Sequence, residues 1–231
     1  ARGRKVALIE AGWFANDNIA SAFAEARTAV CPGVGYRLVD GRDSAARRDA
    51  WAAADIFCSL SDNVQETFGL APIEAMAAGL PAVVSDWDGY RDTVREGVDG
   101  YRIPTAMPAA GFGQPLALRH ALDIDDYDHY IGYVSQFAAV DIDAATRALE
   151  TLFKDAGLRR RMGESARERA REIFDWRRIV AAYQALWGEL AEARKRHAAV
   201  PARGWPTRLD PFALFASFPT ARFGPDTRFE H

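Results

Sequence analysis

Cysteine is scarce in this sequence, and long apolar runs are absent. Among the 231 residues there are only two cysteines, Cys31 and Cys58, and they do not form a C-x-x-C pair. Two cysteines are too few for a disulfide framework or a zinc site, so we expect buried free thiols in a reducing, cytoplasmic setting. No stretch approaches the roughly 18 apolar residues of a transmembrane helix. The opening "ARGRKVALIE" lacks the apolar core of a signal peptide.

An excess of charge of one sign is also absent. The 29 Lys and Arg residues nearly balance the 32 Asp and Glu residues, and the net charge is −3. No global basic field exists to hold nucleic acid or an anionic membrane, so we expect neither as a partner. Mixed charges at helical spacing over residues 159–172 predict a solvated helix face with i,i+4 ion pairs. An anionic ligand therefore requires a local site.

Metal-binding and nicotinamide-binding motifs are weak. The stretch "DIDDYDHY", residues 123–130, gathers four aspartates near His129 but lacks the glycine and distal glutamate of an EF-hand loop. We predict a solvated acidic loop and no metal, with a site of hard oxygen ligands as the alternative. "GVG" at residues 33–35 lacks the third glycine of a dinucleotide fingerprint and precedes a strand. No nicotinamide cofactor is therefore expected.

Short apolar, β-branched segments alternate with helical segments through the first hundred residues. The expected strands are residues 5–10, 35–41, 55–60, 81–85 and 100–104, and the expected helices are residues 16–29, 43–54, 70–78 and 90–97. This order predicts the α/β class, as a Rossmann-like three-layer domain with a parallel sheet flanked by helices. Ligands of such sheets bind outside the carboxyl ends of the strands. The loop from Ser61 to Gly69 follows a strand and therefore lies on the ligand side.

The second half of the sequence is organised differently. Residues 105–128 mix proline, glycine and acids without a clear period, which predicts an irregular insertion. Residues 201–231 contain five prolines and five phenylalanines, which indicates a docking tail. It would dock either on an absent N-terminal domain or on this domain's own core. We therefore divide the chain into a domain over residues 1–200 and this tail. Further helices are expected at residues 143–154, 156–173 and 176–197.

The stretch "QETFGLAPIEAMAAGLP", residues 65–81, carries the most informative chemistry. Glu66 and Glu74 stand with seven residues between them, on either side of a glycine turn that opens a short helix. Glycine lets the backbone approach a ligand closely, and the first turn of a helix offers free N–H groups and a favourable dipole to an anion. The backbone amides of Phe68, Gly69 and Leu70 are therefore candidates for holding a phosphate.

Two carboxylates beside a phosphate need neutral donors as ligands, because an ionised carboxylate only accepts hydrogen bonds. A vicinal diol can donate two hydrogen bonds to one carboxylate, and a nucleotide sugar carries hydroxyls on both sides of its phosphates. We therefore expect Glu74 to hold the ribose diol and Glu66 to hold the hexose. Glu74 lies on a nearly all-apolar helix, where an acid without partners costs several kcal/mol. This cost favours a specific use over a merely solvated acid.

Residues 54–104, "ADIFCSLSDNVQETFGLAPIEAMAAGLPAVVSDWDGYRDTVREGVDGYRIP", resemble the donor-binding half of retaining glycosyltransferases of family four, which have the GT-B fold. The hallmark of that family is a pair of glutamates in the context E-x-F-G-L-x-x-x-E-A-M-A-x-G-x-P-V-V, and this chain matches nearly every position. The likeness continues through residues 148–187, which resemble the closing helices of such enzymes. The double-glutamate context is far more specific than a lone glycine-rich loop.

The resemblance implies a role for each matched residue. Glu66 would be the catalytic-site carboxylate that contacts the transferred sugar, and Glu74 would hold the ribose. The donor is expected to be a UDP- or GDP-linked sugar, transferred with retention of configuration, with no metal and no further cofactor. Ser61 would lie near the phosphates. The remaining donor-binding positions are Thr67, Phe68, Gly69 and Leu70 at the diphosphate or sugar, and Val39, Asp40 and Gly41 beside the base.

The chain departs from the family pattern in two respects. The family commonly has GGxPE after the fourth strand, where this chain has "WDGYRD", residues 87–92. The acceptor-binding N-terminal domain, and an Arg and a Lys that contact the diphosphate, have no counterpart here. We therefore expect little transferase activity from this chain alone. Its expected partners are the nucleotide sugar and that N-terminal domain. Peripheral contact with a membrane is expected only through that domain. The alternatives are a non-catalytic nucleotide-sugar-binding module and a GT-B-fold epimerase or phosphorylase-like enzyme.

Overall fold

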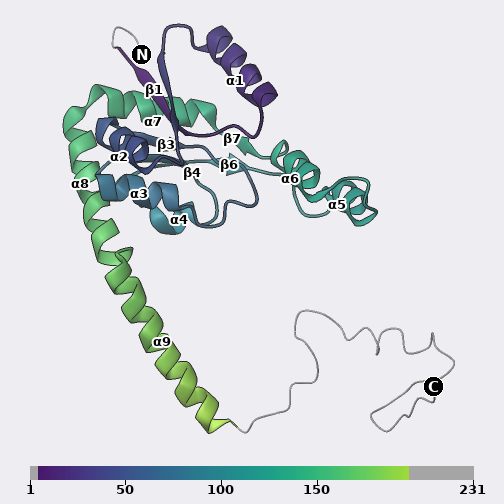
Figure 1. Cartoon of the computed structure of the whole chain (residues 1–231), viewed down its shortest axis with the longest axis vertical. Coiled ribbons are helices and arrows are strands. Elements are labelled where there is room, and N and C mark those ends of the chain that lie inside the picture. Colours follow the sequence, from purple (N-terminus) through teal and green to yellow (C-terminus); the bar gives the residue numbers. More distant parts are fainter. Residues whose placement is uncertain (1–4, 198–231) are drawn as a thin grey trace, which may run out of the picture. The chain divides into compact units, whose positions relative to one another are not determined.

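The computed structural model describes residues 5–197 (Figure 1). The described residues divide between Ile179 and Val180 into two units, which are described separately. The predicted tail, residues 201–231, lies outside the described residues. The elements are β1 Ala7–Gly12, α1 Asp17–Val30, β2 Gly35–Asp40, α2 Ser44–Ala53, β3 Phe57–Ser59, α3 Leu70–Ala78, β4 Ala82–Ser85, α4 Tyr90–Thr93, β5 Gly100–Ile103, β6 Thr105–Ala106, α5 Gln114–Ala121, α6 Tyr127–Ser135, β7 Ala139–Val140, α7 Ile142–Lys154, α8 Ala156–Ile173 and α9 Trp176–Arg196.

The first five strands of the first unit form parallel sheets, as predicted for an α/β domain. β1 pairs with β2, and β3, β4 and β5 form a second sheet in that order, with every pairing parallel. The expected sheet is therefore divided into two hydrogen-bonded parts. The short strands β6 and β7 pair antiparallel with one another.

The core of the first unit lies on both faces of the β3–β4–β5 sheet. Side chains alternate along a strand, so Ala82 and Val84 of β4 point to one face and Val83 to the other. The first face is covered by residues of α3, α4 and α8, and the second by residues of α7 and the start of α8 (Figure 1). The prediction of a sheet covered on both faces is confirmed here. By contrast, α1, β1 and β2 contain no buried residue.

Several helix ends follow from single residues. Asn16 and Asp43 accept hydrogen bonds from backbone N–H groups at the starts of α1 and α2, as their short polar side chains favour. Gly79 ends α3 in the left-handed conformation, with φ of +83°. The helix expected at residues 90–97 is wrong in length, because α4 ends at Thr93 and Val94 is already extended.

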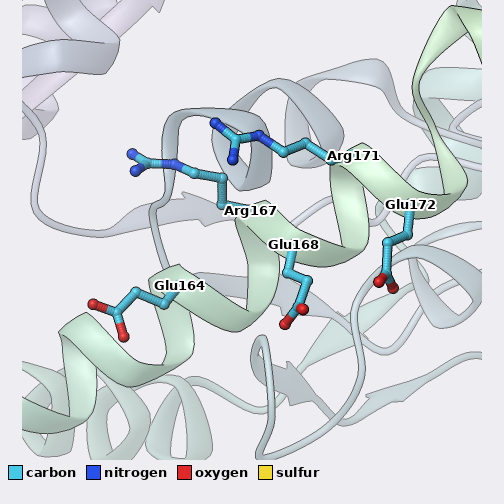
Figure 2. A pocket seen from close by; sticks show the side chains of 5 residues that line it. All are labelled: Glu164, Arg167, Glu168, Arg171 and Glu172. Carbon is cyan, nitrogen blue, oxygen red and sulfur yellow. The ribbon is translucent and has the colours of Figure 1, made fainter.

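The charged face of α8 does not form the expected ion pairs. Arg167 and Arg171 extend from one side of the helix, and Glu168 and Glu172 extend from another (Figure 2). Within residues 5–197, no ion pair joins two members of the 159–172 stretch. Arg167 instead donates to the carbonyl of Ala78 at 2.6 Å. This arginine therefore ties α8 to the last turn of α3 rather than to its own helix.

The expectation of an irregular segment at residues 105–128 is wrong in part. It contains β6 and the helix α5, and α5 packs against α6 through stacked His120 and Tyr130 rings. Two of the four aspartates of residues 123–130 have structural partners, and the first of them, Asp125, pairs with Arg119 at 2.6 Å. Asp126 accepts from the backbone N–H of His129 at the start of α6.

The two cysteines and the aromatic residues of α9 lie at the surface of their units. Cys31 and Cys58 are both free and exposed, so the expectation of buried thiols is wrong. In the second unit, the rings of Tyr183 and Trp187 lie 5.9 Å apart on α9. None of the helices between residues 5 and 197 combines the length and the apolar character that crossing a bilayer requires.

Candidate functional site

The loop between β3 and α3 is organised by Asn63. Its side-chain oxygen accepts from the backbone N–H of Gln65 at 2.9 Å, and its carbonyl accepts from the N–H of Glu66 at 3.0 Å. The same carbonyl accepts from Trp87 Nε1 at 3.1 Å. Asn63 therefore fixes both the turn that presents Glu66 and the position of the neighbouring loop after β4.

The helix α3 begins at this loop with free backbone donors. Gly69 has φ of +70°, a left-handed conformation that favours glycine. No side chain caps this helix start, and Pro72 has no N–H to offer. The amides of Gly69, Leu70 and Ala71 are the remaining donors of the first turn. Two of them, the amides of Gly69 and Leu70, are among the predicted phosphate-binding groups, and the third predicted amide, that of Phe68, directly precedes the helix start.

Glu66 is held from one side by a buried tyrosine. The Tyr90 side chain is 2% exposed, and its hydroxyl donates to Glu66 Oε2 at 3.3 Å. The same hydroxyl lies 2.9 Å from Ser59 Oγ at the end of β3. Burial raises the pKa of the Tyr90 phenol by more than the hydrogen bond with Ser59 lowers it, and the nearby Glu66 carboxylate raises it further. The phenol therefore keeps its proton at neutral pH.

The loop that carries Glu66 packs tightly against the loop after β4. A Cβ on Gly89 would overlap the carbonyl oxygen of Thr67 and would lie 2.6 Å from the Cα of Phe68. A Cβ on Gly69 would in turn overlap the ring of Tyr90. The predicted residues Thr67, Phe68 and Gly69 are thus brought together with Glu66 by close contacts that two glycines permit.

Glu74 is placed on the exposed side of α3. The buried face of this helix consists of Pro72, Ala75 and Met76, whereas Glu74 is exposed and Leu70 is 63% exposed. The expectation that Glu74 carries a burial cost is therefore wrong, because apolar residues also occupy the outer face. Its carboxylate, without a hydrogen-bonding partner in residues 5–197, is open to a ligand.

The other predicted positions lie in different surroundings. Ser61 is half-buried in the loop after β3. Asp40 is paired with Arg42 at 2.8 Å, and hydrogen bonds from Arg42 lower the pKa of Asp40 to about 2. Val39 and Gly41 flank Asp40 at the end of β2, in the sheet that β1 and β2 share. Within the described chain, no hydrogen bond or ion pair joins this trio to the Glu66 loop.

Tyr90, Ser59 and Asn63 are site residues that sequence reasoning missed. Each acts through a contact between segments that are distant in sequence, and no spacing pattern signals such a contact. The departure from GGxPE at residues 87–92 was the only available signal, because it places a tyrosine there. Residues 5–197 contain no group of three or more His, Cys, Asp or Glu side chains arranged to hold a metal ion.

The parallel strands, the flanking helices and the glycine-opened helix define a Rossmann-like α/β domain. Residues 42–110 match the family model described as glycosyl transferases group 1. This segment includes Glu66, Gly69, Glu74 and Tyr90. Residues 42–110 are therefore similar to the group 1 glycosyltransferases, and the predicted resemblance to a family-four glycosyltransferase domain is confirmed.

Known proteins share this domain over part of their length. The chain is 41% identical over 75 residues to the phosphatidyl-myo-inositol mannosyltransferase of Mycobacterium leprae, covering 32% of this chain and 20% of that protein. It is 33% identical over 155 residues to the D-inositol 3-phosphate glycosyltransferase of Geodermatophilus obscurus, covering 65% and 25% respectively. These alignments span about a fifth to a quarter of the curated relatives.

A solved structure shares the fold at low sequence identity. Sucrose-phosphate synthase from Thermosynechococcus elongatus superposes with a TM-score of 0.52 at 21% identity, over 82% of this chain and 39% of that chain. The superposition extends well beyond the segment that the family model matches. The GT-B-type architecture therefore covers most of the chain.

Proposed function

We propose that this chain is the donor-binding part of a retaining glycosyltransferase that uses a UDP- or GDP-linked sugar. Glu74 accepts hydrogen bonds from the ribose diol, and the amides of Phe68, Gly69 and Leu70 hold the diphosphate. Glu66 accepts from hydroxyls of the transferred sugar. Val39, Asp40 and Gly41 border the base, and Ser61 lies beside the phosphates. The acceptor is held by a further domain of the full-length protein.

The observation that carries this proposal is the junction of Glu66 with the start of α3. There, a carboxylate fixed by Tyr90 lies beside Gly69, whose left-handed backbone opens a helix without a side-chain cap. A helix start of this kind favours phosphate, and a fixed carboxylate favours a hydroxyl donor. Adjacent phosphate and hydroxyl groups are what a nucleotide sugar presents. The names of the curated relatives support sugar transfer as the reaction class.

The first test is calorimetric titration of the chain with UDP, GDP and ADP, using Glu74→Ala. Loss of the ribose contacts should cost about 1 to 3 kcal/mol, which is roughly tenfold or more in affinity. Glu164→Ala is the matched control, because Glu164 is also an exposed helical glutamate and lies on α8 (Figure 2). It should leave affinity unchanged. Absence of binding by the native chain at millimolar nucleotide would contradict the proposal.

A second prediction separates the two glutamates. Glu66→Gln should weaken binding of the nucleotide sugar by about tenfold, because an amide accepts only half as many hydrogen bonds as a carboxylate. Binding of the free nucleoside diphosphate should remain unchanged, since it lacks the hexose. The measurement is the ratio of the two dissociation constants. Equal weakening of both ligands would place Glu66 at the phosphates or the ribose instead.

A further inference from the structure

Three segments converge on one side of Glu66. Ser59 ends β3, Tyr90 begins α4, and Glu66 lies in the loop before α3. The Tyr90 hydroxyl contacts both of the other side chains, at 2.9 Å to Ser59 Oγ and 3.3 Å to Glu66 Oε2. A buried phenol requires such partners.

The chemistry of the three groups sets the direction of the hydrogen bonds. An ionised carboxylate can only accept, so Tyr90 donates its single hydroxyl proton to Glu66. The Tyr90 oxygen then accepts from the Ser59 hydroxyl, which fixes the orientation of the phenol. The Ser59 hydroxyl therefore donates to the Tyr90 hydroxyl, which in turn donates to the Glu66 carboxylate.

The two oxygens of the Glu66 carboxylate are consequently different. Oε2 is engaged by Tyr90, whereas Oε1 has no hydrogen-bond partner among residues 5–197 and lies 3.2 Å from the position that a Cβ on Gly69 would occupy. The Tyr90 ring also lies against this position, so that a Cβ on Gly69 would overlap the ring. Glycine at residue 69 therefore allows the ring, the carboxylate and the start of α3 to meet.

We propose that Tyr90 is a positioning residue that holds Glu66 Oε2, so that Oε1 is directed at a hydroxyl of the donor sugar. Ser59 supports the same geometry by orienting the phenol. This inference rests on the proposed donor site and adds a specificity element to it. It also gives a physical role to the tyrosine found where related sequences commonly have the GGxPE motif.

The test compares Tyr90→Phe with the native chain, because phenylalanine keeps the ring in the buried position and removes only the hydroxyl. Affinity for the nucleotide sugar should fall about tenfold, while affinity for the free nucleoside diphosphate should stay the same. Ser59→Ala should lower nucleotide-sugar affinity in the same direction by a smaller factor. A purely structural role for Tyr90 would weaken both ligands equally, which would overturn the proposal.

A measurement without ligand checks the contact itself. The Tyr90 phenol titration is obtained by ultraviolet difference between the native chain and Tyr90→Phe, and is repeated in the Glu66→Gln background. Removing the carboxylate should lower the Tyr90 pKa, because Glu66 raises it in the native chain. An unchanged Tyr90 titration would overturn the proposal.

If the native chain binds neither ligand, the proposed function fails and the role of Tyr90 at a sugar fails with it. Nucleotide-sugar binding that tolerates Tyr90→Phe refutes the positioning role alone.

Discussion

Gly89→Ala should lower the free energy of unfolding of the first unit by about 3 kcal/mol, the upper part of the range for overpacking. The added Cβ would overlap the carbonyl oxygen of Thr67 and approach the Cα of Phe68 at 2.6 Å and the carbonyl carbon of Thr67 at 2.9 Å. All three are backbone atoms, so no side chain can rotate away to relieve the contact. Thermal unfolding should show the midpoint lowered by roughly 6 to 12 °C.

The matched control for this substitution is Gly132→Ala. Gly132 lies inside α6 and is exposed, and a Cβ there would meet no atom within 4 Å. Alanine in an open helical position should stabilise by about 0.5 to 1 kcal/mol. The two substitutions therefore have expected effects of opposite sign. A loss at Gly89 no larger than a few tenths of a kcal/mol would show that the two loops are not in close contact in solution.

Local signals in the sequence predicted much of the fold of the first unit. Asn16 and Asp43 mark the starts of α1 and α2, and Gly79 marks the end of α3, because each supplies a property that a helix end requires. α5 escaped prediction because no side-chain cap marks its start, although the proline in its first turn is compatible with a helix start. α5 packs against α6, and a contact between two helices cannot be read from a local sequence pattern.

The sequence predicted the loop of the candidate site, but it did not predict the residues that hold this loop in place. The glycine between two acids indicated the start of α3 and the free amides there. The roles of Tyr90 and Asn63 depend on contacts across 24 residues of sequence, which no local spacing encodes. The burial argument for Glu74 failed for a related reason, because apolar residues on a short helix do not reveal which face is covered.

Asp99→Ala should cost about 3 kcal/mol of unfolding free energy at neutral pH. The Asp99 side chain is fully buried and accepts from Arg95 Nε at 2.8 Å, from Arg95 Nη2 at 2.7 Å and from Ser165 Oγ at 3.0 Å. Removing one partner of a buried pair typically costs 3 to 5 kcal/mol. We expect the lower end because the Arg95 side chain is 46% exposed, so water replaces part of what is lost. Chemical denaturation measures the difference.

The pH dependence of this loss gives a sharper test than its size. Burial alone would raise the pKa of Asp99, but hydrogen bonds from Arg95 and Ser165 outweigh burial and hold it below its usual value. A carboxyl whose pKa is lower in the folded state stabilises above its unfolded pKa, and this stability is lost as the pH falls through the folded pKa. The difference in unfolding free energy between the native chain and Asp99→Ala should therefore be complete near neutral pH. It should shrink as the pH falls below the usual pKa of a carboxyl group.

Asp92→Ala is the matched control, because Asp92 is an exposed aspartate on the neighbouring helix α4. Its removal should change stability by no more than about 0.5 kcal/mol. A gap between native chain and Asp99→Ala that stays constant from pH 7 to strongly acidic solution would show that Asp99 contributes through packing rather than as a charged acceptor. In that case its hydrogen bonds to Arg95 and Ser165 would not hold residues 95–99 to α8 as the structure indicates.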